Sequence, residues 1–299
     1  MSEGYATKEE RRGPARIRDA EWYGRFMQHP HLVAAFCLIG LFLLLAICAP
    51  FIAPQDPNAQ NLYNKNQGPS ADHLFGTDYL GRDLFSRTLC GLQTSLSIAL
   101  ATIALTFVIG TGVGCYSAYS GGWVDDVVAR VIDVFLAFPT IILALALITL
   151  IGPGVLNMVL MLVVVQWASF ARLMRGQVLS EKNQDYVLSA RAAGLPGWWI
   201  VTRHIIPNAI MPVVILATMD IGHTILTIST LSFLGLGIPP SVPEWGSMIN
   251  AGLNCMRVAP LNVVVPGLAI TAVTLVFNVA GEGLRDVTTD QGPESGATL

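Results

Sequence analysis

Long apolar stretches constrain what this chain can fold into more than any other feature of its sequence. A helix needs about 20 apolar residues to cross the hydrocarbon core of a membrane. The stretches that approach or exceed that length lie at residues 32–52, 96–118, 131–151, 155–171, 209–236 and 261–283. Charged residues make up only 12% of the chain, whereas a soluble domain carries about 25%. The sequence therefore predicts an all-α integral membrane protein with about six transmembrane helices.

The polar segments divide the chain into four parts. We expect an N-terminal tail over 1–31 and a first span with its outer loop over 32–95. A transmembrane core follows over 96–284 and contains a polar loop at 172–207; a C-terminal tail covers 285–299. Because the N-terminal tail is too long and too acidic for a cleavable signal peptide, we expect it to be retained.

Basic residues indicate how the spans are oriented. Thirteen of the seventeen lysines and arginines fall in the two tails and in residues 119–130 and 172–207. Lysine and arginine are concentrated in the cytosolic loops of membrane proteins. We therefore predict that both termini are cytosolic and that loop 172–207 lies on the same side.

Several functions are excluded by what the sequence lacks. A net charge of −3 leaves no basic excess for nucleic acid. Neither the nucleotide-binding motif G-x-x-x-x-G-K-[ST] nor the metalloprotease motif H-E-x-x-H occurs. The five cysteines show no C-x-x-C spacing, and a Cys90–Cys255 pair on the outer side stays open. The sequence thus predicts a chain without a catalytic constellation, a bound cofactor or a metal centre.

The polar loop after the fourth predicted span has its own local structure. Residues 185–193 favour a helix, Gly194 suits its C-terminal cap, and Pro196 follows shortly after. A second short helix is expected over 197–206, after a sharp corner. Ala190 and Ala193 would leave a small, close-packing surface at the tip. On physical grounds alone, a hairpin that merely connects two spans remains an alternative.

The same loop carries a family resemblance. Ser189-Ala190-x-x-x-Gly194, followed by Ile205-Ile206-Pro207-Asn208-Ala209, resembles the loop signature of ABC importer permeases. That signature usually reads Glu-Ala-Ala-x-x-x-Gly and then Ile-x-Leu-Pro. Here Ser189 stands in place of the Glu and Ile206 in place of the Leu. In that family the loop forms the coupling helix, which docks in a groove on the cytosolic ATPase.

Three further segments are similar to dipeptide, oligopeptide and nickel permeases within that family. They are Phe75–Arg87, the stretch from Ser232 to Gly246, and Gly281-Glu282-Gly283-Leu284-Arg285-Asp286. The last resembles the family's Gly-Asp-Gly-Leu-Arg-Asp, with Glu for Asp. The matches occur in the family's order between Phe75 and Asp286.

The resemblance implies a type I ABC importer permease in the bacterial inner membrane, working by alternating access. It also implies a second homologous permease, one or two ATPase subunits that hold ATP and Mg²⁺, and an extracytoplasmic substrate-binding protein. The residues it assigns to ATPase coupling are Ser189, Ala190, Arg191, Ala193, Gly194 and Pro207. Dipeptides, longer peptides, opine-like metal chelates and nickel all remain open as substrates.

A cluster of turn-forming and charged residues precedes the second predicted span. Its members are Gly76, Thr77, Asp78, Gly81, Arg82, Asp83 and Arg87. The glycines and aspartates are typical of turns and helix caps. The arginines can pair with the carboxylates. We expect a structural clamp at the outer membrane surface rather than a substrate contact.

Span five contains polar residues that are costly inside a membrane. They are Met219, Asp220, His223 and Thr227, of which Asp220 and His223 share one helical face. One hypothesis is that this face lines the translocation path, where Asp220 receives a substrate cation or His223 contacts a chelated metal. The other is an Asp–His hydrogen bond that locks the helices. Two ligands are too few for a metal site.

Two other classes of membrane protein stay as alternatives. A stand-alone secondary transporter tends to show two similar halves with interrupted helices, and no clear internal repeat is visible. An intramembrane hydrolase would need paired aspartates or a Ser–Lys pair within the spans, which we do not find. Co-purification with an ATPase separates the importer from both.

Overall fold

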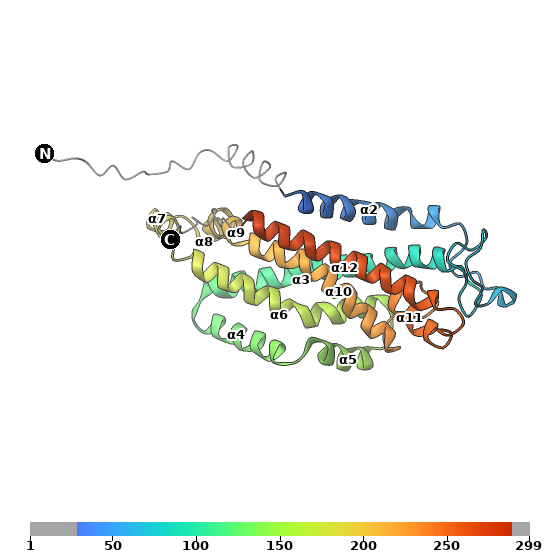
Figure 1. The fold of residues 1–299 in the computed structure, drawn as a ribbon. Coiled ribbons are helices and arrows are strands. Elements are labelled where there is room, and N and C mark those ends of the chain that lie inside the picture. Colours follow the sequence, from blue (N-terminus) through green and yellow to red (C-terminus); the bar gives the residue numbers. More distant parts are fainter. Residues whose placement is uncertain (1–28, 289–299) are drawn as a thin grey trace, which may run out of the picture.

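The computed structural model describes residues 29–288, and over them the chain is helical (Figure 1). The helices in chain order are α2 (Pro30–Ile52), η1 (Leu62–Asn64), α3 (Leu84–Ser120), α4 (Gly122–Ala137), α5 (Thr140–Ile151), α6 (Val155–Glu181), α7 (Asp185–Ala192), α8 (Gly197–Ile200), η2 (Val201–Ile205), α9 (Ile206–Ala209), α10 (Met211–Phe233), α11 (Trp245–Leu253) and α12 (Leu261–Thr288). Among the described residues, five helices are long and apolar enough to cross a membrane, and the number of spans is six if α4 and α5 count as one. The predicted fold class is confirmed, while the predicted tails lie largely outside the described residues.

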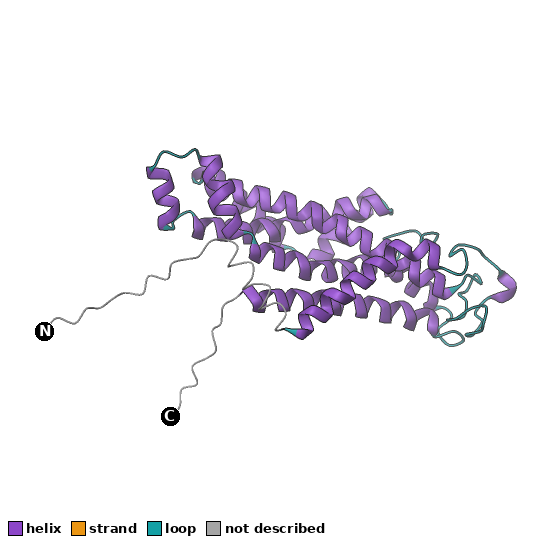
Figure 2. Ribbon diagram, turned by 90° about the horizontal axis from the view of Figure 1, so that it is seen from above, coloured by secondary structure: helices purple, strands orange, loops and turns teal. Residues whose placement is uncertain are grey.

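The long helices form an elongated bundle (Figures 1 and 2). Helices α3, α6, α10 and α12 run side by side; α2 packs on α3 and α12, and α4 and α5 pack on α6. The short helices α7 to α9 lie at one extremity, here named the α7 end. Helix α11 and the loop of residues 53–83 lie at the other, the α11 end (Figure 1).

Helices α3 and α6 approach each other closely at two glycines. A Cβ on Gly110 would lie 2.7 Å from the carbonyl oxygen of Trp167, and one on Gly114 would lie 3.0 Å from the Cα of Ala171. Because the glycines are four residues apart, they share one face of α3 and let the two backbones come together. This small-residue seam places α3 at the centre of the bundle.

The third predicted span, 131–151, is wrong as a single helix. Helix α4 begins earlier, at Gly122, and ends at Ala137; α5 follows after a bend of 90°. Phe138 is extended, with φ −97° and ψ 140°, and Pro139 precedes α5. Proline disfavours the helical conformation in the residue before it and cannot donate to the preceding turn. The hydropathy of the stretch hid this break.

The second span is longer than predicted. Helix α3 begins at Leu84 rather than near residue 96, because Asp83 caps it by accepting a hydrogen bond from the Ser86 amide. Its 37 residues correspond to a length of about 55 Å, against about 30 Å for the hydrocarbon core. Helix α6 likewise continues to Glu181, so the first ten residues of the predicted loop 172–207 are helical.

Candidate functional site

The α7 hairpin, residues 185–200, has the local structure that its sequence predicts. Helix α7 ends at Ala192. Gly194 follows with φ +76°, a left-handed conformation that glycine adopts without steric cost. The amide of Leu195 donates to the carbonyl oxygen of Ala190 at 3.2 Å, closing the turn. Helix α8 begins at Gly197 after the corner, and Pro207 lies in the first turn of α9. The predicted cap and corner are confirmed.

Three large apolar side chains of the α7 hairpin are exposed. Trp198 is 70% exposed, Leu188 48% and Leu195 37%. Large apolar side chains left exposed within one short hairpin are typical of an interaction surface. Sequence reasoning did not single out these three residues, because it followed the motif rather than the face that folding leaves open.

The motif residues themselves are divided between the two faces of the hairpin. Ser189, Ala193 and Gly194 are exposed. Ala190 is only 8% exposed and belongs to the hydrophobic core, so the predicted surface of two alanines at the tip is wrong for this residue. Arg191 lies with its guanidinium carbon 5.3 Å from the ring centroid of Tyr119, on the chain's own α3.

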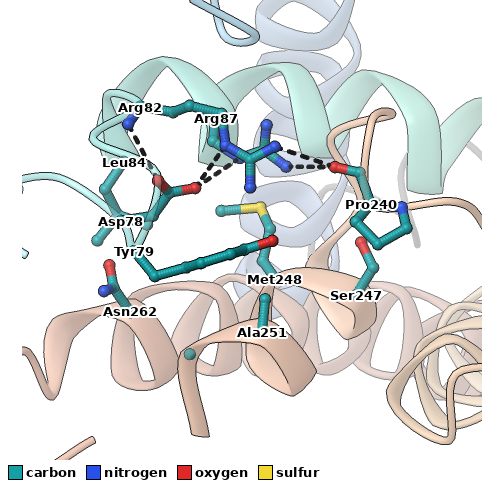
Figure 3. A pocket seen from close by; sticks show the side chains of 11 residues that line it. Asp78, Tyr79, Arg82, Leu84, Arg87, Pro240, Ser247, Met248, Ala251 and Asn262 are labelled. Atoms are coloured by element: carbon teal, nitrogen blue, oxygen red, sulfur yellow. Dashed lines mark hydrogen bonds and ion pairs between the residues drawn. The ribbon is translucent and has the colours of Figure 1, made fainter. Parts of the chain in front are cut away.

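At the α11 end, two arginines converge on one carboxylate and one carbonyl oxygen (Figure 3). Arg82 Nε lies 2.6 Å from Asp78 Oδ2, and Arg87 Nε lies 3.7 Å from the same oxygen. Both guanidinium groups also donate to the carbonyl oxygen of Pro240, each at 3.2 Å. The three charged residues are at most 7% exposed. The predicted clamp is present, but it is buried rather than exposed.

Asp83 has a different partner from the one expected. Its Oδ1 lies 3.0 Å from His73 Nδ1, and its Oδ2 caps α3. Gly76 and Gly81 have φ values of +82° and +72°. A Cβ on Gly81 would collide with the carbonyl oxygen of Asn61. The predicted turn chemistry is thus confirmed, and it folds loop 53–83 onto the start of α3.

A buried glutamate joins the same end to α10. Glu244 accepts hydrogen bonds from the Gly246 and Ser247 amides, each at 2.8 Å, and caps α11. Burial raises the pKa of the Glu244 carboxyl above its ordinary value, although these amide bonds act in the opposite direction. The next residue, Trp245, donates its indole N–H to the carbonyl oxygen of Thr88 on α3 at 3.0 Å.

The four candidate pathway residues of α10 do not share one environment. Met219 lies against Gly281 of α12. Thr227 is buried and donates to the carbonyl oxygen of His223. Asp220 is half-buried and His223 is exposed. Within residues 29–288, neither of their side chains makes a hydrogen bond or an ion pair within 4.0 Å. Asp220 and His223 therefore have polar groups without a partner among the described residues.

Residues 29–288 contain no group of three or more His, Cys, Asp or Glu side chains that could hold a metal ion. All five cysteines are free, Cys90 and Cys255 included. The disulfide that the sequence left open is therefore not formed.

Comparison with known proteins identifies the family. Residues 110–288 match the family described as "Binding-protein-dependent transport system inner membrane component". This chain belongs to it. Residues 17–69 match the "N-terminal TM domain of oligopeptide transport permease C", and the two matched segments together include most of the chain.

Curated relatives resemble the chain over most of its length. It is 40% identical over 267 residues to the "Glutathione transport system permease protein GsiD" of Pectobacterium atrosepticum, covering 89% of each chain. It is 42% identical over 270 residues to GsiD of Escherichia coli O6:K15:H31, covering 89% and 88%. It is 37% identical over 254 residues to the "Dipeptide transport system permease protein DppC" of Alkalihalophilus pseudofirmus, covering 85% and 84%.

Solved structures agree on the fold. One inward-facing structure of the MetNI methionine ABC transporter superposes with a TM-score of 0.55 at 20% identity, covering 68% of this chain and 96% of that one. A second crystal form gives 0.56 at 18% identity, covering 69% and 98%. The family match and the curated relatives show that the chain is a multi-pass inner-membrane permease subunit of an ABC importer, a class that works with ATPase subunits and a substrate-binding protein. This result favours the importer over the stand-alone secondary transporter and the intramembrane hydrolase.

Proposed function

We propose that this permease imports small peptides by alternating access, forming half of the translocation path beside a second homologous permease. ATP and Mg²⁺ bind to one or two partner ATPase subunits, and this chain itself is not catalytic and holds no cofactor. The observation that carries the substrate class is the similarity to permeases for glutathione, a tripeptide, and for dipeptides, at 37–42% identity over at least 84% of each chain. These relatives favour a peptide over nickel.

We place the α7 end in the cytosol and the α11 end outside. The support is the distribution of basic residues, thirteen of seventeen of which fall in segments at the α7 end or in the tails. In this orientation the α7 hairpin faces the ATPase. Loop 53–83 and α11 then face the substrate-binding protein.

The α7 hairpin is the proposed coupling segment. Its exposed motif residues, Ser189, Ala193 and Gly194, lie in the same short hairpin as the exposed apolar side chains of Leu188 and Trp198. A tryptophan that fills a pocket on a partner protein is a frequent hot spot of a protein interface. We therefore assign the contact with the ATPase to this combined face.

The proposed path runs along the open side of α10. A carboxylate at the bilayer centre costs several kcal/mol unless it meets water or an opposite charge, about 3 kcal/mol on insertion scales. Asp220 lies near the middle of α10, and none of the ion pairs found within residues 29–288 includes it. Facing the path, it would meet water and the α-ammonium group that a free peptide carries. His223 lies one turn further along the same side.

Co-purification tests the assembly, and uptake tests the substrate. The chain is purified in detergent with its genomic neighbours expressed, and ATPase activity is measured on the eluate. The complex is then placed in proteoliposomes with its binding protein and given dipeptides, glutathione or Ni²⁺. ATP-dependent uptake of peptide supports the proposal. Uptake of Ni²⁺ alone, or a chain that carries no ATPase, overturns it.

A further inference from the structure

The α7 hairpin is seated on the last turn of α3. The guanidinium of Arg191 lies over the ring of Tyr119, at 5.3 Å from its centroid. On the other side of the corner, a Cβ on Gly197 would lie only 2.9 Å from the Tyr119 hydroxyl oxygen and 3.2 Å from Cε1. One aromatic side chain of α3 therefore contacts both helices of the hairpin.

Neighbouring contacts hold the same junction. Lys182, between α6 and α7, donates from Nζ to the carbonyl oxygen of Ala118 at 2.8 Å. The buried side chains of Val187, Ala190 and Ile200 share a hydrophobic core with those of α3, including Ala118. Interiors packed in this way transmit displacement rather than absorbing it. The hairpin and the end of α3 thus form one body.

Helix α3 connects this body to the opposite end of the molecule. It runs without interruption from the α7 end to the α11 end, where Arg87 donates to the carbonyl oxygen of Pro240 (Figure 1). A displacement of the hairpin can therefore be transmitted to that end through one continuous helix.

We propose that Tyr119 is a positioning residue that sets the angle between the α7 hairpin and α3, so that movement of the hairpin reaches α3. The inference rests on the proposed coupling role of the hairpin. Two features give it specificity. The ring contacts the Arg191 guanidinium in cation–π geometry, and its hydroxyl oxygen lies 2.9 Å from the place where a Cβ of residue 197 would be. Tyr116, one turn earlier on α3, is 68% exposed and provides a matched control.

The test uses the complete transporter in proteoliposomes and measures peptide imported per ATP hydrolysed. Tyr119→Ala removes the side chain that contacts both helices of the hairpin. We expect the amount of peptide imported per ATP to fall about fivefold, while ATPase binding and the melting temperature stay near wild type. Tyr119→Phe keeps the ring and should restore most of the ratio. Tyr116→Ala should match wild type.

A double variant tests the contact with residue 197. Gly197→Ala places a methyl group against the hydroxyl and should lower the ratio. Adding Tyr119→Phe removes that oxygen, so the double variant should import better per ATP than Gly197→Ala alone.

The inference is overturned if Tyr119→Ala behaves like Tyr116→Ala, or if Tyr119→Ala releases the ATPase or lowers the melting temperature as a simple packing defect would. It is also overturned if the two changes at 119 and 197 are additive. Failure of the proposed function itself is distinct, because the wild-type chain would then carry no ATPase.

Discussion

Charged side chains are buried near one end of α3, whereas large apolar side chains are exposed near the other. At the α11 end, Asp78, Arg82 and Arg87 are at most 7% exposed, and each binds a partner within the chain. At the α7 end, Leu188 is 48% and Trp198 is 70% exposed, with apolar surface facing outwards. The charged cluster is completed by partners within its own chain, whereas the hairpin exposes apolar side chains that another subunit can cover. The difference teaches that the clamp stabilises the fold, whereas the hairpin offers a surface.

The largest effect is expected from Asp78→Ala at the closed end. The change leaves Arg82 and Arg87 without their shared carboxylate, and breaking a buried ion pair in this way costs about 3–5 kcal/mol. We expect a large drop in melting temperature in detergent. Asp72→Ala is the control, because Asp72 is exposed in the same loop. Equal melting temperatures for the two variants would show that the clamp is dispensable.

At the open end, Trp198→Ser should separate binding from stability. Loss of an interface tryptophan typically costs about 2 kcal/mol, or roughly thirtyfold in affinity for the ATPase. The melting temperature of the isolated chain should not change, since the side chain is already exposed. Trp123→Ser is the matched control, because Trp123 is 76% exposed at the start of α4. The hairpin loses its assigned role if both variants retain the ATPase equally.

Between the two ends, Asp220→Asn tests the open side of α10. Removal of the charge should lower peptide uptake about tenfold, equivalent to about 1.4 kcal/mol, without releasing the ATPase. Thr230→Val on the same helix should transport normally, because the Thr230 hydroxyl only donates to the carbonyl oxygen of Leu226. Wild-type uptake by Asp220→Asn would remove this residue from the path.

The smallest effect concerns two ion pairs near the α7 end. Arg172 and Asp133 are 55% and 58% exposed, so Arg172→Ala should cost less than about 0.5 kcal/mol. Arg175 binds Asp125 through two hydrogen bonds of 2.6 and 2.8 Å and is more buried. Arg175→Ala should therefore cost more, about 1–2 kcal/mol. Thermal unfolding in detergent compares them, and the reverse order would contradict the role given to burial.

Local chemistry was predictable wherever it involves only neighbours in the chain. Gly194 ends α7, and Gly76 and Gly81 form turns, because a left-handed backbone favours glycine at any of these positions. Pro139 also carried a readable signal, the break of the third span, which the continuous hydropathy of residues 131–151 concealed. Helix-cap chemistry at Asp83 was expected, but the prediction still began the second span near residue 96 instead of directly after this cap, at Leu84.

The sequence by itself determined the all-helical membrane fold, the corner of the hairpin and the family resemblance, because apolar length, turn residues and motif order are local properties. Tertiary structure alone decided which side chains are buried. Arg87 binds a carbonyl oxygen 153 positions away, at Pro240. Ala190 points into a core shared with α3. Burial depends on which segments meet across the bundle, and residue spacing along one helix does not specify that meeting.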